Sequence, residues 1–425
     1  MYSFAHMADV HLGAYSRPEM EELESKVFAK ALSDCVEANV DFILISGDLF
    51  HSNAPARLKV VKLAVAKMRW VTEQGIPIYV IFGNHDHSAT STSLIEVIES
   101  AGLLRNISVL DYADDDKLKL HPVEDEKTGA KLTGMSAMKR GLEREYYKQL
   151  DRDDLQRLDG FKIFAFHSAI TELVPYNLRN LETISLSLLP KGFSYYAGGH
   201  VHQNSISSPS DYENIVFPGP LFTGYGRDLE MTAQMAARGE FRGFYLVKFE
   251  EEVKSINFVE TNLSQCIYCP HNLSGLTARE AQIQLSEGLE TLDVKGKIVV
   301  LKVWGQLSSG NIYDIPFKKL TTLLTDNGAT YVDFNRAGLM AQEYIPVQKS
   351  GLDRSEVEED LFKEQIGAFK ANIPNLQSTP GIKLSIELLK STRREKREGE
   401  TVLEYEKSIL ENALELFDLK GIYQD

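Results

Sequence analysis

Histidines that follow short apolar segments constrain this chain more than any other feature of its sequence. Six of its ten histidines fall in five short polar clusters, and each cluster follows an apolar run typical of a buried strand. In open α/β sheets the loops at the carboxyl ends of the strands converge, so the five clusters are expected to face one site. The clusters are Asp9-Val10-His11, Gly47-Asp48-Leu49-Phe50-His51, Gly83-Asn84-His85-Asp86, His167-Ser168 and Gly199-His200-Val201-His202.

The side chains of these clusters indicate a metal site. Aspartate, histidine and one asparagine, without cysteine, suit Mn²⁺, Fe²⁺ or Zn²⁺. Seven candidate ligands exceed the needs of one catalytic ion, whereas two ions that share a carboxylate use them all. Two ions about 3.5 to 4 Å apart can hold both the attacking and the leaving oxygen of a phosphoryl displacement. The candidate ligands are Asp9, His11, Asp48, Asn84, His167, His200 and His202.

Three glycines, Gly47, Gly83 and Gly199, stand where the chain leaves a strand, and they fit sharp exits that bring the backbone close to the ions. Taken singly, each cluster is more often an ordinary loop than a site. The combination of all five, each after an apolar strand, is what predicts the metal centre.

Residues 1–264 alternate between predicted strands and helices, which indicates an α/β domain. Helical spacing of apolar residues predicts packing helices at 19–39 and 57–74. Short apolar runs predict strands at 2–7, 41–46, 76–82, 131–138, 161–166, 195–198, 215–217, 243–249 and 255–260.

A cluster of Cys, Pro, His, Asn and Gly at 262–275 predicts a domain boundary. Residues 265–350 are predicted to form a small α/β domain, and residues 351–425 a charged helical region without strands. The elements expected there are a helix at 278–289, a strand at 297–304, a helix at 313–325, a strand at 330–335, and helices at 355–371 and 401–419.

The charge balance and the cysteine content exclude several classes of protein. Lys and Arg total 46 against 61 Asp and Glu, and the net charge of −15 argues against nucleic-acid binding by bulk positive charge. Nucleic acid stays possible as a substrate, because site metals would offset the carboxylates. Three cysteines, no signal peptide at the start and no long apolar segment predict a cytosolic or nucleoid-associated protein without a membrane span.

The five clusters resemble those of the calcineurin-like metallophosphoesterase superfamily, whose fold is a β-sandwich flanked by helices (αββα) with a dinuclear metal centre. Within it the chain most resembles the Mre-eleven/SbcD family, the nuclease subunit of a DNA double-strand-break repair complex. The resemblance is strong over residues 1–220 and architectural beyond about 265. The segments that carry it are His6-Met7-Ala8-Asp9-Val10-His11-Leu12-Gly13, Gly47–His51, Gly83–Asp86 and Gly199–His202.

Carried over by position, the resemblance implies two Mn²⁺ ions, with other divalent metals possible. It assigns Asp9, His11, Asp48 and His202 to one ion, and Asp48, Asn84, His167 and His200 to the other, so that Asp48 bridges them. It implies that His85 stabilises the scissile phosphate or protonates the leaving oxygen, while Asp86 orients the His85 ring.

Two positions distinguish subtypes. His51 resembles the archaeal and eukaryotic branch, because the bacterial enzymes commonly carry aspartate there, and it acts either near the DNA or as a hydrogen-bonding residue. Asp86 stands where phosphoprotein phosphatases of the superfamily carry glutamate, which disfavours a Ser/Thr phosphatase.

The resemblance also implies partners. Residues 351–425 would bind an SMC-like ATPase of the Rad-fifty/SbcC type, unless their amphipathic helices pack on the core or on each other. Segments 57–74 and 92–104 would form a homodimer interface, unless Leu58, Val61, Ile95 and Ile98 belong to the core.

The function expected is therefore a Mn²⁺-dependent DNA exonuclease and endonuclease that acts in double-strand-break repair. The alternatives are a phosphoesterase acting on nucleotides or phosphoproteins, and a catalytically quiet DNA-end scaffold. Two further features stay open. Cys266, Cys269 and His271 supply one ligand too few for structural zinc. The glycine-rich loop at 217–228 either lines a substrate groove or is a simple connection.

Overall fold

The chain divides into two compact units, Met1–Gln342 and Glu343–Asp425. The computed structural model describes residues 1–52, 57–87, 92–112, 117–137, 143–174, 181–224, 228–341, 358–359, 361–363, 366, 378–397, 399–417 and 419.

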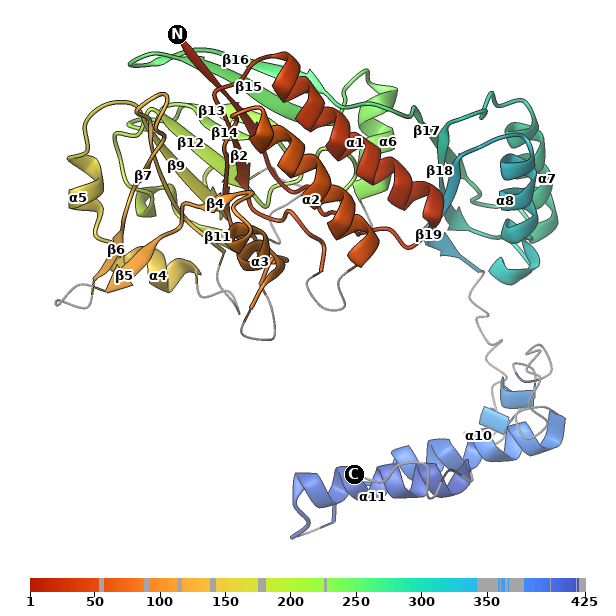
Figure 1. Ribbon diagram of the computed structural model, residues 1–425. Coiled ribbons are helices and arrows are strands. Elements are labelled where there is room, and N and C mark those ends of the chain that lie inside the picture. The colour runs from red at the N-terminus through yellow and green to blue at the C-terminus, as the bar shows by residue number, and fades with distance from the viewer. Residues whose placement is uncertain are drawn as a thin grey trace. The chain divides into compact units, whose positions relative to one another are not determined.

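Two six-stranded sheets form the centre of the first unit (Figure 1). The first sheet has the order β16-β15-β1-β2-β3-β4, where β1 is Tyr2–Met7, β2 Phe42–Ser46, β3 Ile78–Ile81, β4 Arg105–Asn106, β15 Gly243–Phe249 and β16 Val253–Glu260. The second has the order β13-β14-β12-β9-β8-β7, where β7 is Val123–Glu124, β8 Lys131–Met135, β9 Lys162–His167, β12 Tyr195–Gly199, β13 Ser205–Ser207 and β14 Ile215–Phe217.

The strands in the middle of each sheet are parallel, and this places the loops that follow them at one edge of the sheet. Strands β1, β2, β3 and β4 pair in parallel, and so do β8, β9, β12 and β14. The carboxyl ends of these strands therefore lie along one edge of each sheet. Two short pairs lie outside the sheets, β5 (Leu110–Tyr112) with β6 (Leu118–Leu120) and β10 (Ala169–Ile170) with β11 (Thr183–Ile184).

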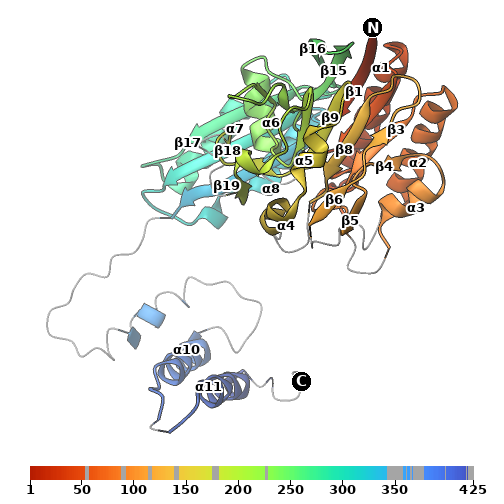
Figure 2. The ribbon, with the colours of Figure 1, turned by 90° about the vertical axis from the view of Figure 1, so that its left-hand side faces the viewer.

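Helices cover the outer faces of the two sheets, and Figures 1 and 2 show the resulting layers. Side chains such as Phe4, Phe42 and Ile163 fill the space between the sheets, and separate apolar clusters lie under the helices. This arrangement confirms the predicted helix-flanked β-sandwich. The helices are α1 (Pro18–Glu37), α2 (Leu58–Glu73) and α3 (Leu94–Ser100) on the first sheet, and α4 (Glu143–Gln149), α5 (Arg152–Gln156) and the 3₁₀ helix η3 (Leu186–Leu188) near the second.

A smaller parallel sheet of three strands, in the order β17-β18-β19, completes the first unit. Helices α7 and α8 pack on one face, and α6 contacts the other. The sequence did not predict β17, which lies inside the segment interpreted as a boundary. Its Pro270 is tolerated because β17 is an edge strand. The elements are α6 (Asp228–Ala237), β17 (Cys266–Asn272), α7 (Ala278–Glu290), β18 (Ile298–Gln306), η4 (Ile312–Asp314), α8 (Phe317–Asp326) and β19 (Tyr331–Met340).

The second unit contains two neighbouring helices, α10 (Ser378–Thr392) and α11 (Val402–Leu416). Thr401 and Glu404 form a capping box that starts α11 close to the predicted position. The sequence did not predict α10, which lies between the two helices expected at 355–371 and 401–419. The helix predicted at 355–371 lies largely outside the described residues. Among the helices that are described, none is long and apolar enough to cross a membrane.

Candidate metal centre

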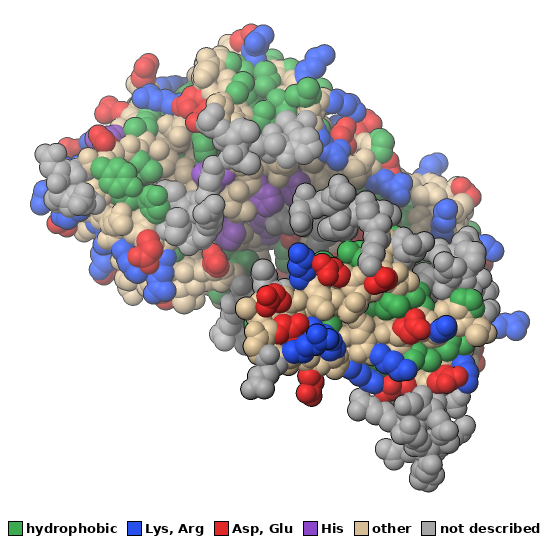
Figure 3. All heavy atoms as spheres, turned by 90° about the horizontal axis from the view of Figure 1, so that it is seen from below, with side chains coloured by type: hydrophobic (Ala, Val, Ile, Leu, Met, Phe, Trp, Pro, Cys, Tyr) green, Lys and Arg blue, Asp and Glu red, His purple; other side chains and the backbone are tan. Residues whose placement is uncertain are grey.

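The seven predicted ligands stand at or just beyond the carboxyl ends of five strands. Asp9, Asp48 and Asn84 follow β1, β2 and β3 of the first sheet, while His167 ends β9 and His200 follows β12 of the second. Both sheets therefore contribute to one site, as the parallel topology predicts. Histidine side chains gather on this face of the unit, where Figure 3 colours them purple.

The backbone at the strand ends turns sharply. Asp9, His11, Asp48 and His200 have φ values of 51°, 49°, 54° and 78°, in the left-handed region that non-glycine residues seldom adopt. Each costs about 1 kcal/mol or more, so the surrounding structure must hold it. Backbone hydrogen bonds join the first two loops, from His11 N–H to the Asp48 carbonyl at 2.9 Å and from Asp9 N–H to the Gly47 carbonyl at 3.1 Å.

The three glycines allow close approach at the strand exits. Gly47 has φ of +88°, which glycine alone adopts freely. A Cβ at Gly83 would collide with the side chain of Asp48, and one at Gly199 would collide with the Ser46 carbonyl. The backbone is thus packed against the candidate ligands themselves.

Four ligands form a buried floor: Asp9, His11, Asp48 and His167 are each at most 2% exposed. The Asp48 carboxylate lies 3.2 Å from His167 Nε2 and 3.5 Å from His11 Nε2. His167 donates its Nδ1 hydrogen to the Ser46 carbonyl at 2.8 Å, which leaves Nε2 as the ligand atom facing the site.

Three ligands form a more open rim. Asn84 Oδ1 lies 3.0 Å from His200 Nδ1 and 3.3 Å from His167 Nε2. His202 Nε2 lies 3.1 Å from His11 Nε2 and 3.7 Å from Asp9 Oδ1. Oxygen and nitrogen atoms from several strands therefore surround the space between the floor and the rim.

The electrostatic environment sets the protonation state of the candidate ligands. Burial lowers the pKa of His11 and lowers that of His200 to about 4, so both rings stay neutral with lone pairs available. Burial opposes the ion pair between Asp48 and His167, but their mutual attraction outweighs it, lowering the pKa of Asp48 and raising that of His167 to about 9. A cation must therefore displace a proton from this pair in order to bind.

The residues present fit a dinuclear centre. Asp9 Oδ2 is buried and has no hydrogen-bond partner among the described residues, which is costly for a carboxylate unless a cation binds it. Ligand atoms of Asp9, His11 and His202 lie within 4.8 Å of one another, as do those of Asp9, Asp48 and His167. Asp9 belongs to both groups, and the Asp48 carboxylate lies near His11 and His167, one candidate ligand of each ion, so two buried carboxylates lie where two neighbouring ions would meet.

His85, Asp86 and His51 lie beside this centre, but their contacts differ from expectation. The His85 ring donates from Nδ1 to the His51 carbonyl at 2.9 Å and stacks on the His51 ring at 4.9 Å. The buried Asp86 carboxylate instead accepts the N–H groups of Leu49, Phe50 and Gly83. The backbone of His51 therefore orients the His85 ring, and Asp86 holds the two loops together.

Sequence reasoning missed three residues that support the ligands. Asp228 accepts a hydrogen bond from His202 Nδ1, Arg242 donates to the His202 carbonyl, and Glu24 accepts the N–H groups of Gly13 and Ala14 just after His11. Asp228 and Arg242 lie 26 and 40 positions from His202, and Glu24, although in a predicted helix, bonds a loop that precedes the helix, so no local pattern indicated these contacts. The described part of the loop at 217–228 reaches the site, because Gly224 lies against His202 and Asp228, while residues 225–227 lie outside the described residues.

Cys266, Cys269 and His271 do not form a second metal centre. Strand β17 alternates its side chains, so Cys266 packs toward α6 whereas Cys269 lies in the core under α7 and α8. Burial raises the pKa of each thiol to about 11. Both cysteines are therefore thiols at neutral pH that lie in separate apolar clusters.

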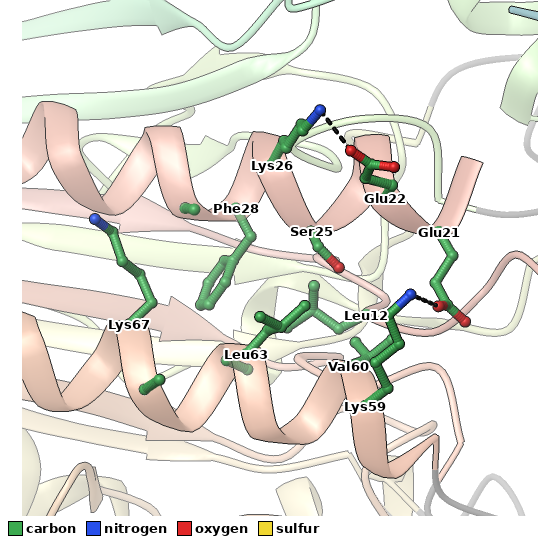
Figure 4. Close-up of a pocket in the computed structure, with 13 residues that line it drawn as sticks. Leu12, Glu21, Glu22, Ser25, Lys26, Phe28, Lys59, Val60, Leu63 and Lys67 are labelled. Carbon is green, nitrogen blue, oxygen red and sulfur yellow. Dashed lines mark hydrogen bonds and ion pairs between the residues drawn. The ribbon is translucent and has the colours of Figure 1, made fainter. Parts of the chain in front are cut away.

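An apolar groove of about 550 Å³ lies between α1 and α2, and Figure 4 shows its lining. Phe28, Val60 and Leu63 form its floor, and the pairs Lys26–Glu22 and Lys59–Glu21 lie at its rim. None of the predicted ligands lines this groove, so it is separate from the metal centre.

Comparison with known proteins agrees with this geometry. Residues 2–204 match the family described as Calcineurin-like phosphoesterase. The DNA double-strand break repair protein Mre11 of Archaeoglobus fulgidus is 30% identical over 231 residues, which cover 51% of this chain and 49% of that protein. The Mre11 protein of Methanococcus maripaludis is 28% identical over 246 residues, covering 57% of this chain and 62% of that protein.

The matched segments thus span about half to three fifths of the length of these two curated relatives. Among solved structures, a dimetal phosphatase from Danio rerio aligns with a TM-score of 0.39 and 11% identity, covering 61% of this chain and 97% of that one.

Proposed function

Residues 2–204 form a calcineurin-like metallophosphoesterase domain, and from this premise we propose that the chain is a Mn²⁺-dependent DNA exonuclease and endonuclease that acts in double-strand-break repair. The observation that carries the proposal is the convergence of candidate ligands from five strand ends around the buried carboxylates of Asp9 and Asp48. The similarity to archaeal Mre11 repair proteins supports DNA as the substrate.

In this proposal Asp9, His11, Asp48 and His202 hold one ion, and Asp48, Asn84, His167 and His200 hold the other. The family's two divalent metals would lower the pKa of a water and offset the charge of the phosphate. Mn²⁺ is proposed because the family resemblance implies it, and the imidazole, carboxylate and amide ligands are compatible with it as they are with Fe²⁺ or Zn²⁺.

His85 is proposed as the residue that acts on the phosphate ester. Its Nδ1 donates to the His51 carbonyl, which fixes the rotation of the ring, and we assign Nε2 to hydrogen-bonding the scissile phosphate or protonating the leaving oxygen. Stacking on His51 restrains the ring, and Asp86 fixes the loop that bears His85. This assigns His51 and Asp86 to positioning.

The test of the proposal is Mn²⁺-dependent degradation of end-labelled duplex and single-stranded DNA. We expect His85→Ala to lose about 100-fold or more in rate, because general acid catalysis contributes at least that much. The exposed His121→Ala is the matched control and should degrade DNA as wild type does. Hydrolysis of a model phosphodiester or phosphopeptide without DNA cleavage would favour the other phosphoesterase function, and DNA binding without any hydrolysis would favour a scaffold.

We further propose three domains, residues 1–264 for nuclease activity, 265–350 as a DNA-recognition cap and 351–425 for binding an SMC-like ATPase of the Rad-fifty/SbcC type. Val402, Leu410 and Phe417 of the last region are 60%, 55% and 40% exposed within their own unit, which leaves apolar surface for a partner. Deleting residues 351–425 should abolish co-purification with the ATPase, and retained binding would contradict this assignment. Action on chromosomal DNA implies a cytoplasmic, nucleoid-associated protein.

A homodimer through α2 and α3 completes the proposal. Leu58, Leu63 and Val97 are 74%, 48% and 55% exposed, whereas Ile95 and Ile98 are buried in the core of the first unit. The exposed set, rather than Ile95 and Ile98, is therefore expected at the interface. Leu58→Glu should turn a dimer into a monomer in light scattering, while Leu263→Glu, at another exposed leucine, should not. A wild-type monomer at micromolar concentration would contradict the dimer.

A further inference from the structure

Helix α6 begins at a residue that holds one of the candidate ligands. Asp228, its first residue, accepts the Nδ1 hydrogen of His202 at 2.5 Å. This contact fixes the tautomer and the rotation of the ring, so that Nε2 faces Asp9 and His11. A Cβ at Gly224 would collide with the Asp228 carboxylate, so the space around this hydrogen bond is fully used.

The same helix also holds the backbone of His202. The buried Arg242 donates from Nη1 to the His202 carbonyl at 2.5 Å and from Nε to Thr232 Oγ1 at 3.0 Å. Thr232 lies in α6, one turn beyond Asp228. Hydrogen bonds therefore link both the ring and the main chain of His202 to this helix.

Helix α6 in turn is anchored to the three-stranded sheet. Leu229 and Ala233 pack with Ile298 and Val300 of β18. Glu230 accepts hydrogen bonds from Tyr268 of β17 and Asn335 of β19, and Lys302 of β18 lies 3.4 Å from its carboxylate. One helix thus contacts all three strands of that sheet while its first residue contacts the metal centre.

We propose that Asp228 is a positioning residue for His202 and that α6, through Asp228, makes the affinity of one metal ion depend on the placement of the three-stranded sheet. The inference rests on the proposed dinuclear centre, because it concerns the ion that His202 would hold. A displacement of the sheet would move Glu230 and with it the helix start, so the ion at His202 would respond while the ion at Asn84, His167 and His200 would not.

The experiment is Mn²⁺ titration calorimetry on the full chain, with electron paramagnetic resonance of the bound ions as a second readout. We expect two Mn²⁺ per wild-type chain. Asp228→Ala should weaken one of them by about 10- to 100-fold, the usual cost of removing a residue that orients a metal-bound histidine. Asp228→Asn keeps the shape of the side chain and loses its charge, so its Mn²⁺ affinity should lie between those of wild type and Asp228→Ala. It replaces Asp228→Ala in the experiment if that variant does not fold.

Glu230→Ala tests the connection to the sheet. It should weaken the binding of the same ion by a smaller factor. This effect should vanish when Asp228→Ala is already present, because Glu230 acts on the ion through Asp228. Glu240→Ala, at an exposed glutamate beyond the helix, is the matched control and should bind as wild type does.

Each result decides a different point. Wild-type affinity for both ions in Asp228→Ala would overturn the role of Asp228. An effect of Asp228→Ala without any effect of Glu230→Ala would overturn the connection to the sheet. A wild-type chain that binds no Mn²⁺ would refute the proposed dinuclear centre itself, and so the failure of that proposal is distinguished from the failure of this one.

Discussion

The strand ends of the β-sandwich and the body of strand β17 both carry residue types that bind metals, yet they place them in opposite ways. At the strand ends, side chains from several strands converge into groups of three whose ligand atoms lie within 4.8 Å of one another. On β17, Cys266 and Cys269 point to opposite faces of one sheet and enter two different apolar clusters. Only the first region brings its candidates together.

The difference arises from topology rather than from composition. Ligands on successive parallel strands meet because the carboxyl ends of those strands share an edge. Ligands three residues apart within one strand separate, because side chains alternate between faces. The spacing Cys-x-x-Cys therefore indicates zinc only where the chain turns between the two cysteines, which β17 does not do.

The largest effect that tests this comparison is the loss of Asp48. Asp48→Asn should lower Mn²⁺-dependent hydrolysis by about 1,000-fold, because Asp48 is the carboxylate proposed to bind both metal ions, and two such ions would supply several kcal/mol of charge stabilisation. Steady-state rates on a model phosphodiester measure it. Cys266→Ser and Cys269→Ser, in the other region, should stay within about twofold of wild type. A strong loss in either cysteine variant would mean that the two regions do not differ as argued.

Much of the first region could be predicted from sequence. Strands such as Tyr2–Met7 and Gly243–Phe249 appear where apolar runs predicted them, because a strand buried on both faces leaves a continuous apolar signal. Polar residues directly after such runs then identify the candidate ligands. That order explains why Asp9, Asp48 and His167 could be named before any geometry was known.

The remaining features depend on contacts between distant segments. Strand β17 contains Pro270 and His271 and lacks a clear apolar run, so pairing with β18 rather than local pattern defines it. Asp228 pairs with His202 across 26 positions, and the ring of His85 is held by a backbone carbonyl that no sequence pattern identifies. Tertiary contacts of this kind leave no periodic signal.

Metal removal gives the next largest effect. Mn²⁺ at about 100 times its dissociation constant should raise the free energy of unfolding by about 2.7 kcal/mol, because it binds only the folded strand ends. Calorimetry with and without a chelator measures the increment. The double variant Cys266→Ser with Cys269→Ser should show the same increment, and a smaller one would indicate that β17 also binds the metal.

Close packing at the strand ends predicts a smaller effect. Gly83→Ala should destabilise the chain by about 2 kcal/mol and weaken Mn²⁺ binding, because its methyl group would collide with Asp48. Gly75→Ala is the matched control, since its φ of +78° is strained for alanine while no atom lies within 4 Å of the new Cβ. It should cost about 1 kcal/mol and leave the metal affinity unchanged. Equal metal affinities in both variants would show that space around Asp48 does not matter.

His6 extends the comparison to a histidine inside a strand, a few residues before the candidate ligand His11. Its ring nitrogens lie 2.9 Å from the Tyr195 hydroxyl and 2.8 Å from Ser46 Oγ, and burial lowers its pKa from an ordinary 6.5 to about 3. The unfolded chain therefore binds one more proton than the folded chain between these values, so this contribution to stability is full above pH 6.5 and is lost as the pH falls.

The slope that His6 contributes should be about 1.4 kcal/mol per pH unit. His6→Asn should unfold more easily at neutral pH, because it loses a hydrogen bond in the core, yet its stability should fall less steeply between pH 6 and pH 4. Urea unfolding at several pH values measures both, with the exposed His121→Asn as the control that keeps the wild-type slope. An unchanged slope in His6→Asn would mean that the folded chain accepts a proton at His6. The interior of strand β1 would then tolerate a charged histidine. In that case His6 could not be distinguished from the candidate ligand His11 by its buried, uncharged state.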